Sequence, residues 1–200
     1  MRLLTGILLI SASLMPLSGE PISQGDREYA LSALHASRKM FLDSVAGLSE
    51  SQLNFKPAAD KWSIAEVAEH IALSEGFIFQ AVQGALQTPA REKMTDARKL
   101  DEKILAAVPD RTVKRTAPEP LQPHHQYKSV AEAVAAFKSA RDSHIAYIGA
   151  TQDPLREHFS KHPALGELDA YQWILLMSAH TERHVNQILE VKASPGFPQQ

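Results

Sequence analysis

Apolar residues recur three and four positions apart in four long segments of the chain, which is the spacing of an amphipathic helix. The first helix is expected to begin near Ser23 or Gly25 and to end at Gly47, and the others are expected over 63–84, 129–151 and 169–195. Each of these three opens at a capping signal, in which Ser or Asp precedes Glu or Gln by three residues. No strand pattern competes with them. The chain therefore predicts an all-α fold, a four-helix bundle.

The connection between the second and third helices is much longer than a turn. Its residues, 86–128, show a weak pattern in which 95–108 could form a short helix, and four prolines interrupt the residues after that helix. A crossover of this length can return the chain to the end of the bundle from which it came. The order of the helices therefore stays open on pattern alone. The other connections are expected to hold one turn at 49–52 and a loop at 162–166.

The first twenty residues form a separate segment. Arg2 is followed by an apolar stretch and then by small residues, as in a secretory signal. The stretch is too short for a comfortable transmembrane helix. We therefore expect a signal peptide at 1–20, a bundle domain at 23–195, an exported protein that is periplasmic or secreted, and no membrane span after signal removal. An uncleaved N-terminal membrane anchor and a misassigned start codon are the alternatives.

Composition narrows the classes of function. The 200 residues suit one domain, and 21 basic against 23 acidic side chains give a formal charge of −2. Such a balance sets up no field that would gather phosphate backbones, so nucleic-acid binding is not indicated. The chain has no cysteine, which excludes disulfides, thiolate nucleophiles and cysteine-ligated metals. Any metal must therefore be bound by histidine, carboxylate or water.

Three histidines are the candidate metal ligands. His180 and His184 lie one turn apart on the face of the last helix that also carries Trp173, Met177 and Ile188, so both rings are expected to point inward. His70 flanks the apolar stripe of the second helix. Three neutral imidazoles without a fourth protein ligand describe an open site, in which the ion acts as a Lewis acid. Zinc, nickel, iron and copper all accept such ligands, so the sequence does not choose the divalent ion.

Each of these assignments has a plainer alternative. A pair of histidines four residues apart can arise by chance, with rings that are only polar groups of the core. Glu66 could orient His70 from the preceding turn, or could act only as the capping partner of Ser63. His144 is the best additional candidate for the site. Two further histidines, His124 and His125, lie in a proline-bounded loop and are expected to be exposed.

Three segments together resemble the DinB/YfiT-like superfamily. They are KWSIAEVAEH at 61–70, HPALG at 162–166 and QWILLMSAHTERHVNQI at 172–188, and the resemblance covers nearly all of the chain after the expected signal. It implies an up-down-down-up bundle with a long crossover between the second and third of the four helices, and a metal triad of His70, His180 and His184. It also implies kinship with thiol S-transferases for bacillithiol or mycothiol, and with maleylpyruvate isomerases that use a thiol cofactor.

The sequence thus predicts a metal-dependent enzyme, a hydrolase or a thiol S-transferase, that acts on an unidentified small molecule. The expected export disfavours the thiol reaction, because low-molecular-weight thiols are cytosolic. A metal- or ligand-binding bundle without catalysis is the alternative. No catalytic group beyond the metal is identifiable, and a homodimer is left open because no exposed apolar stripe predicts one.

Overall fold

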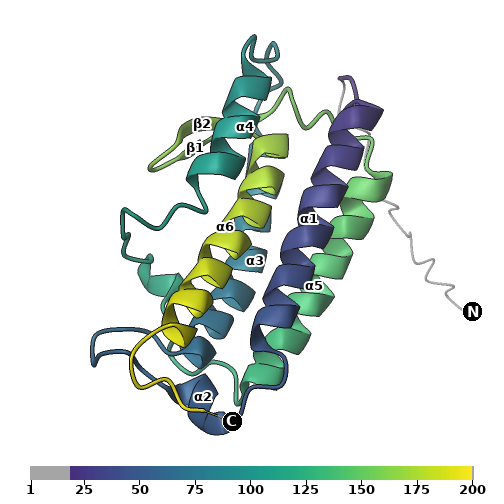
Figure 1. Ribbon diagram of the computed structural model, residues 1–200. Coiled ribbons are helices and arrows are strands. Elements are labelled where there is room, and N and C mark those ends of the chain that lie inside the picture. Colours follow the sequence, from purple (N-terminus) through teal and green to yellow (C-terminus); the bar gives the residue numbers. More distant parts are fainter. Residues whose placement is uncertain (1–18, 200) are drawn as a thin grey trace, which may run out of the picture.

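The computed structural model of the chain describes residues 19–199, and four long helices form a bundle within them (Figure 1). Shorter elements lie in the connections, and the predicted four-helix bundle is confirmed. The long helices are α1 Gln24–Val45, α3 Ile64–Leu86, α5 Val130–Ala150 and α6 Ala170–Lys192; the short ones are α2 Glu50–Asn54, α4 Ala97–Ala107 and the single turn η1 Glu119–Leu121.

The bundle has the up-down-down-up order that the family resemblance implies. Helices α1 and α6 run in one direction, and α3 and α5 run in the other (Figure 1). Each of α1 and α3 packs against both α5 and α6. Because α3 and α5 are parallel, the chain must return along the bundle before α5 can begin. The long crossover that carries α4 and η1 makes this return.

Local capping fixes where the helices begin. The Ser63 hydroxyl accepts from the backbone N–H of Glu66 at 3.2 Å, and the Glu66 carboxylate accepts from the N–H of Ser63 at 2.7 Å. Glu66 also pairs with Lys56 at 2.8 Å. Its capping role is therefore the one that the structure realises, and no hydrogen bond joins it to His70 among the described residues.

A small hairpin departs from the expectation that the chain contains no strands. Strands β1 Phe159–His162 and β2 Gly166–Asp169 pair antiparallel, and His162 lies opposite Gly166. Gly166 has a φ of +82°, a conformation that glycine adopts without strain. The predicted loop at 162–166 is the tip of this hairpin. The sequence does not reveal these strands, because four residues are too few to show an alternating pattern. In addition, Asp169, the last residue of β2, is also the N-cap of α6.

The core consists of two apolar clusters separated by a polar layer. One cluster holds Leu34, Ile78, Ile148 and Met177, and the other holds Phe41, Ile71, Phe137 and Val185. Between them, on all four helices, lie buried polar side chains: Ser37, Ser74, Glu75, Arg141, His144, Ser178 and Thr181. Polar groups in this position need partners inside the bundle, because water does not reach them.

A second buried charged cluster closes the end of the bundle where α1 and α6 begin. The Arg156 guanidinium donates to Asp26, Asp101 and Asp169 at 2.7–3.3 Å. A groove of about 640 Å³ opens beside it, lined in part by Lys93, and none of the three candidate metal ligands lines this groove. In this groove Lys93 pairs with Glu20, and Arg156 pairs with the aspartates of the cluster. The cluster therefore ties α4 and the hairpin to the bundle.

The pH dependence of stability should report on Asp169 in this cluster. Burial raises the pKa of its carboxyl to about 6 from 3.8, although Arg156 opposes the change. The folded state therefore binds this proton more tightly than the unfolded state, and the contribution of Asp169 to stability falls as the pH rises from about 4 to 6. Asp169→Asn keeps a capping side chain and removes the titration. Urea unfolding should show the variant gaining on the wild type by on the order of 2 kcal/mol between pH 4 and 7; a difference that stays constant with pH contradicts this assignment.

The described residues bear on whether a helix spans a membrane, whereas the expected signal lies almost entirely before them. Among residues 19–199, no helix is both long and apolar enough to cross a membrane. The expected signal at 1–20 falls outside the described residues except for Gly19 and Glu20.

Candidate metal centre

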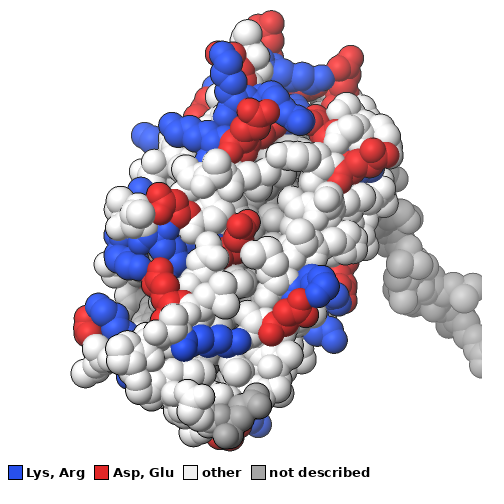
Figure 2. Space-filling view, in the orientation of Figure 1, with Lys and Arg blue, Asp and Glu red and all other residues white. Residues whose placement is uncertain are grey.

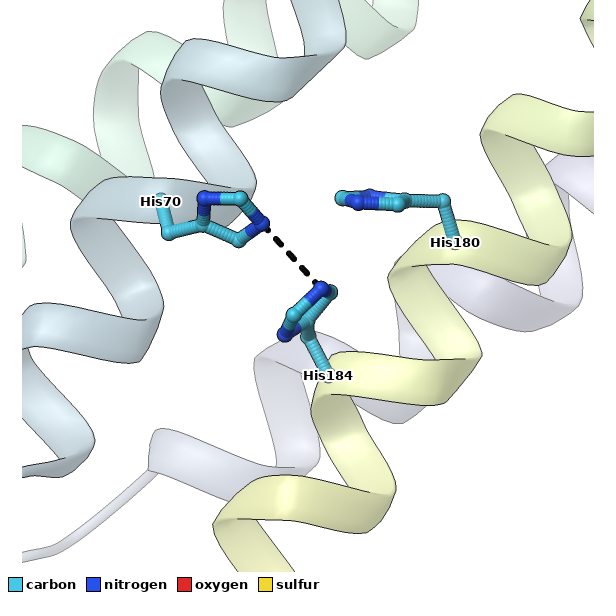
Figure 3. Close-up of side chains that lie close together, drawn as sticks. All are labelled: His70, His180 and His184. Atoms are coloured by element: carbon cyan, nitrogen blue, oxygen red, sulfur yellow. Dashed lines mark hydrogen bonds between the residues drawn. The ribbon is translucent and has the colours of Figure 1, made fainter. Parts of the chain in front are cut away.

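The three predicted histidines lie together between α3 and α6 (Figure 3). His70 comes from α3, and His180 and His184 come from successive turns of α6. One nitrogen from each ring lies within 4.8 Å of the other two. The ring centroids of His70 and His184 are 4.3 Å apart, and those of His180 and His184 are 4.5 Å apart. Capping fixes where α3 and α6 begin, and the packing of the two helices against each other brings these three side chains together.

Hydrogen bonds fix the protonation of two rings. The Nδ1 atom of His70 lies 2.6 Å from the carbonyl oxygen of Leu121, which can only accept, so this nitrogen carries the proton. The Nδ1 atom of His184 lies 2.9 Å from Oε1 of Gln187. Arg111 also donates to that oxygen at 3.2 Å, and a guanidinium only donates, so the amide cannot be flipped. His184 therefore donates through Nδ1 as well.

Both Nε2 atoms consequently present lone pairs to each other. They are 3.1 Å apart, the contact that is dashed in Figure 3. Two neutral rings with this tautomer cannot hydrogen-bond at this contact, and the Ser74 hydroxyl, 3.4 Å from Nε2 of His70, can donate to only one of them. A cation shared by the two nitrogens removes the repulsion. The donors thus fit a metal ion, which binds imidazole through an unprotonated nitrogen.

Burial keeps the rings in their neutral form. The pKa of His70 is lowered by burial, against the bond to Leu121, which raises it. The pKa values of His180 and His184 are lowered far more, first by burial and then by the other histidines of the site. A proton is therefore a poor substitute for a metal ion here. A zinc-like ion at about 2.0–2.1 Å from each ligand needs nitrogens roughly 3.3 Å apart. The three nitrogens here lie within 4.8 Å of one another, so a shift of the rings brings them to that spacing.

The crossover is fastened to the same part of α6. Arg183 donates to the carbonyl oxygens of Val108, Asp110 and Val113, and Asn186 donates to that of Pro109 at 3.2 Å. Arg183 has the appearance of an ordinary surface residue in the sequence, and a backbone acceptor leaves no sequence signal. The bonds to Arg183, Asn186 and His70 show that the crossover is part of the site.

The other candidates lie elsewhere. His144, the predicted additional member, donates through Nδ1 to the Glu75 carboxylate at 3.0 Å in the polar layer and stacks on Phe79. It misses the site because its helix, α5, packs mainly against α1 and α3, and its ring lies against Glu75 and Phe79 of α3. His124 and His125 are exposed, as expected. Trp62 packs on His70 with ring centroids 5.1 Å apart and so forms part of the wall of the site.

Gln187 should affect metal affinity by orienting the His184 ring, without binding the ion itself. Gln187→Met keeps a side chain of similar size but removes the oxygen that accepts from Nδ1 of His184. Loss of such an orienting bond typically weakens a metal site by about 10–100-fold, and we expect at least tenfold here. Competition with a chromophoric chelator measures the affinity. Gln152→Met, an exposed position outside the site, is the matched control; equal affinity of the two variants contradicts the role of Gln187.

Comparisons with known proteins agree with the arrangement. Residues 33–188 match the profile of the DinB superfamily. The chain is 30% identical over 164 residues to the uncharacterized protein YuaE of Bacillus subtilis (strain 168), a match that covers 81% of this chain and 96% of that protein. Its fold is similar, with a TM-score of 0.59 and 14% identity over 92% of this chain and 94% of the other, to YfiT from Bacillus subtilis, described as "a probable metal-dependent hydrolase with an unusual four-helix bundle topology". The chain belongs to the DinB superfamily.

Proposed function

We propose that this protein is a metal-dependent hydrolase of a small molecule, with a divalent ion bound by His70, His180 and His184. The observation that carries the proposal is the pair of lone pairs that face each other at 3.1 Å, next to a third neutral imidazole. When bound, the ion supplies Lewis acidity, which polarises a substrate oxygen and lowers the pKa of water. No further His, Asp or Glu of the described residues joins the three ligands.

The protein's own residues prepare the site in two ways. Leu121 and Gln187 hold two of the rings with their Nε2 atoms turned towards each other, so metal binding needs no change of tautomer in these rings. The buried surroundings keep the rings neutral, so no proton has to leave them at neutral pH. Since all three protein ligands are uncharged, the ion would retain its full charge for the substrate side.

Hydrolysis is favoured over S-transfer by two arguments. The described fold is similar to that of YfiT, which is named a probable metal-dependent hydrolase. We also propose that the protein is exported, periplasmic or secreted, on the pattern of residues 1–20. A low-molecular-weight thiol would then be scarce where the protein works, whereas water is not. Fractionation of cells that produce the full chain tests the location.

Metal removal is the experiment that tests the function. Protein purified without a His tag should contain about one divalent ion per chain and should hydrolyse members of an ester and amide panel. Dialysis against a chelator should abolish the activity, and return of the ion should restore it. Bound metal without turnover of any substrate indicates a binding module instead. Protein that binds no zinc, nickel, iron or copper indicates that the three histidines are only polar groups of the core.

A further inference from the structure

The crossover bridges the two helices that carry the triad. On the α6 side, its residues 108–113 are held by Arg183 and Asn186. On the α3 side, the Leu121 carbonyl accepts from His70. The intervening residues, 114–120, therefore run between the turn of α6 that carries His184 and the turn of α3 that carries His70. A molecule that approaches the three histidines from the side of the crossover contacts side chains of this stretch.

Positive charge is concentrated where the crossover meets α6. Four basic residues lie there, Arg111, Lys114, Arg115 and Arg183, and Asp110 and Glu190 are the acidic residues that interact with them. Figure 2 shows Lys and Arg side chains on this flank of the molecule, with Asp and Glu side chains among them. The excess stands out because the whole chain carries a formal charge of −2. The charge of these basic residues attracts an anion to this flank.

Arg115 differs from its basic neighbours in lacking a partner. Arg111 and Lys114 both pair with Glu190, and Arg183 is occupied by three backbone carbonyls. Arg115 is exposed and forms no hydrogen bond or ion pair with any of residues 19–199. Its guanidinium, with donors in a fixed planar fork, is free to bind a carboxylate or a phosphate through two parallel hydrogen bonds.

His162 lies beside the same stripe of α6 as the triad. Its ring packs on Trp173, with ring centroids 5.2 Å apart, and Trp173 shares that stripe with His180. The charge of Arg115 adds to burial in lowering the pKa of His162. The hairpin tip also fixes its tautomer, since the backbone N–H groups of Ala164 and Leu165 both donate to Nδ1, at 3.1 and 3.0 Å. The neutral ring therefore carries its proton on Nε2, as a second donor near the triad.

We infer that Arg115, together with Nε2–H of His162, forms an anion-binding subsite beside the triad, and that the substrate carries a carboxylate or phosphate group. The inference rests on the proposed function for the reaction, but the subsite itself does not require turnover. The anionic group binds at the crossover, and the bond to be broken is thereby directed towards the three imidazoles. A neutral analogue loses this contact and also leaves the guanidinium unpaired.

A pair of esters that differ in charge tests the inference when the enzyme turns over. Mono-p-nitrophenyl succinate and p-nitrophenyl butyrate are close in size, but only the first carries a carboxylate. We expect wild-type kcat/KM to favour the succinate ester by about tenfold, the effect of one charge-assisted contact, and to lose part of the preference in high salt. Arg115→Gln should reduce the preference to within about twofold, and Arg115→Lys should keep part of it. Arg98→Gln, which removes an exposed arginine at the far end of the bundle, should leave it unchanged.

Intrinsic fluorescence tests the same subsite without catalysis. The chain has two tryptophans, and both report on this region: Trp62 packs on His70, and Trp173 lies 5.2 Å from His162 between ring centroids. Titration with succinate, inorganic phosphate and neutral succinamide should give saturable changes for one or both anions and none for succinamide. The anion that binds more tightly identifies the group, and Arg115→Gln should weaken its binding by about tenfold.

The outcomes separate the subsite from the proposed reaction. Binding of an anion that depends on Arg115, with no hydrolysis of either ester, supports the subsite and counts against the hydrolase. Hydrolysis without a preference for the charged ester, together with no fluorescence response to either anion, overturns the subsite and leaves the hydrolase intact. Anion binding that Arg115→Gln does not change also overturns it.

Discussion

His184→Ala should weaken binding of a divalent ion by at least about 100-fold, because it removes one of the three proposed ligands, whereas loss of a mere orienting bond typically costs about 10–100-fold. The expected effect of the substitution on the stability of the metal-free protein is small. Without an ion, the wild-type Nε2 atoms of His70 and His184 face each other at 3.1 Å with unshared lone pairs, a repulsion that alanine relieves. Relief of this repulsion should offset part of the packing that the buried ring supplies.

Thermal unfolding with and without metal separates this expectation from a structural role. Excess ion should raise the Tm of the wild type, since a ligand of the folded state stabilises it in proportion to the logarithm of its concentration. The increase should vanish in His184→Ala and persist in His124→Ala, which alters an exposed loop histidine. If the three rings are only core groups, the reverse pattern appears: no metal effect in the wild type, and a large loss of Tm in His184→Ala under all conditions.

The helices and the triad could be predicted because both depend on local spacing. Ser63, Ser129 and Asp169 each cap a helix that begins at the next residue, as their patterns indicate. Once the helix is given, residues four positions apart share a face, so His180 and His184 were bound to point the same way. The position of His70 opposite them followed from the apolar stripe of its own helix. The three rings meet because the apolar stripes of α3 and α6 face each other.

The partners of the triad could not be predicted, because they depend on the path of the crossover. The carbonyl of Leu121 reaches His70 across 51 positions of sequence, and any residue type offers the same carbonyl. Gln187 is different. It lies three residues after His184, a spacing at which side chains on a helix interact, so the sequence held a usable signal for it. The strands of the hairpin were missed because they are short and pair only with each other.

The polar layer was missed for a different reason. Arginine is rarely buried, so the sequence does not mark Arg141 or Glu75 as a core residue, yet Arg141 is fully buried. The two residues are 66 positions apart and on different helices. Their pairing is visible only in the packed bundle, where the Arg141 guanidinium donates to the Glu75 carboxylate.

Arg141→Met should destabilise the protein by about 3–5 kcal/mol, the usual effect of removing one partner from a buried ion pair. Arg141 donates to both carboxylate oxygens of Glu75, at 2.6 and 2.7 Å, and also to Ser37 and Thr181. Methionine fills part of the space but satisfies none of these groups. Urea unfolding measures the loss. Arg38→Met, which breaks an ion pair with the exposed Asp142, should cost less than about 1 kcal/mol.

The pH dependence of this loss identifies its cause. Burial acts to raise the pKa of Glu75, but the hydrogen bonds and charge of Arg141 outweigh it and hold the pKa below its usual value. Without Arg141, burial should raise the pKa, so the folded variant binds a proton that the unfolded chain releases. Its stability deficit against the wild type should therefore grow as the pH rises from 5 to 8. The double variant Glu75→Gln, Arg141→Met should recover much of the loss and show no such growth, because no charge is left buried. A deficit that is independent of pH and is not rescued would mean that lost packing, and not the unpaired carboxylate, destabilises Arg141→Met.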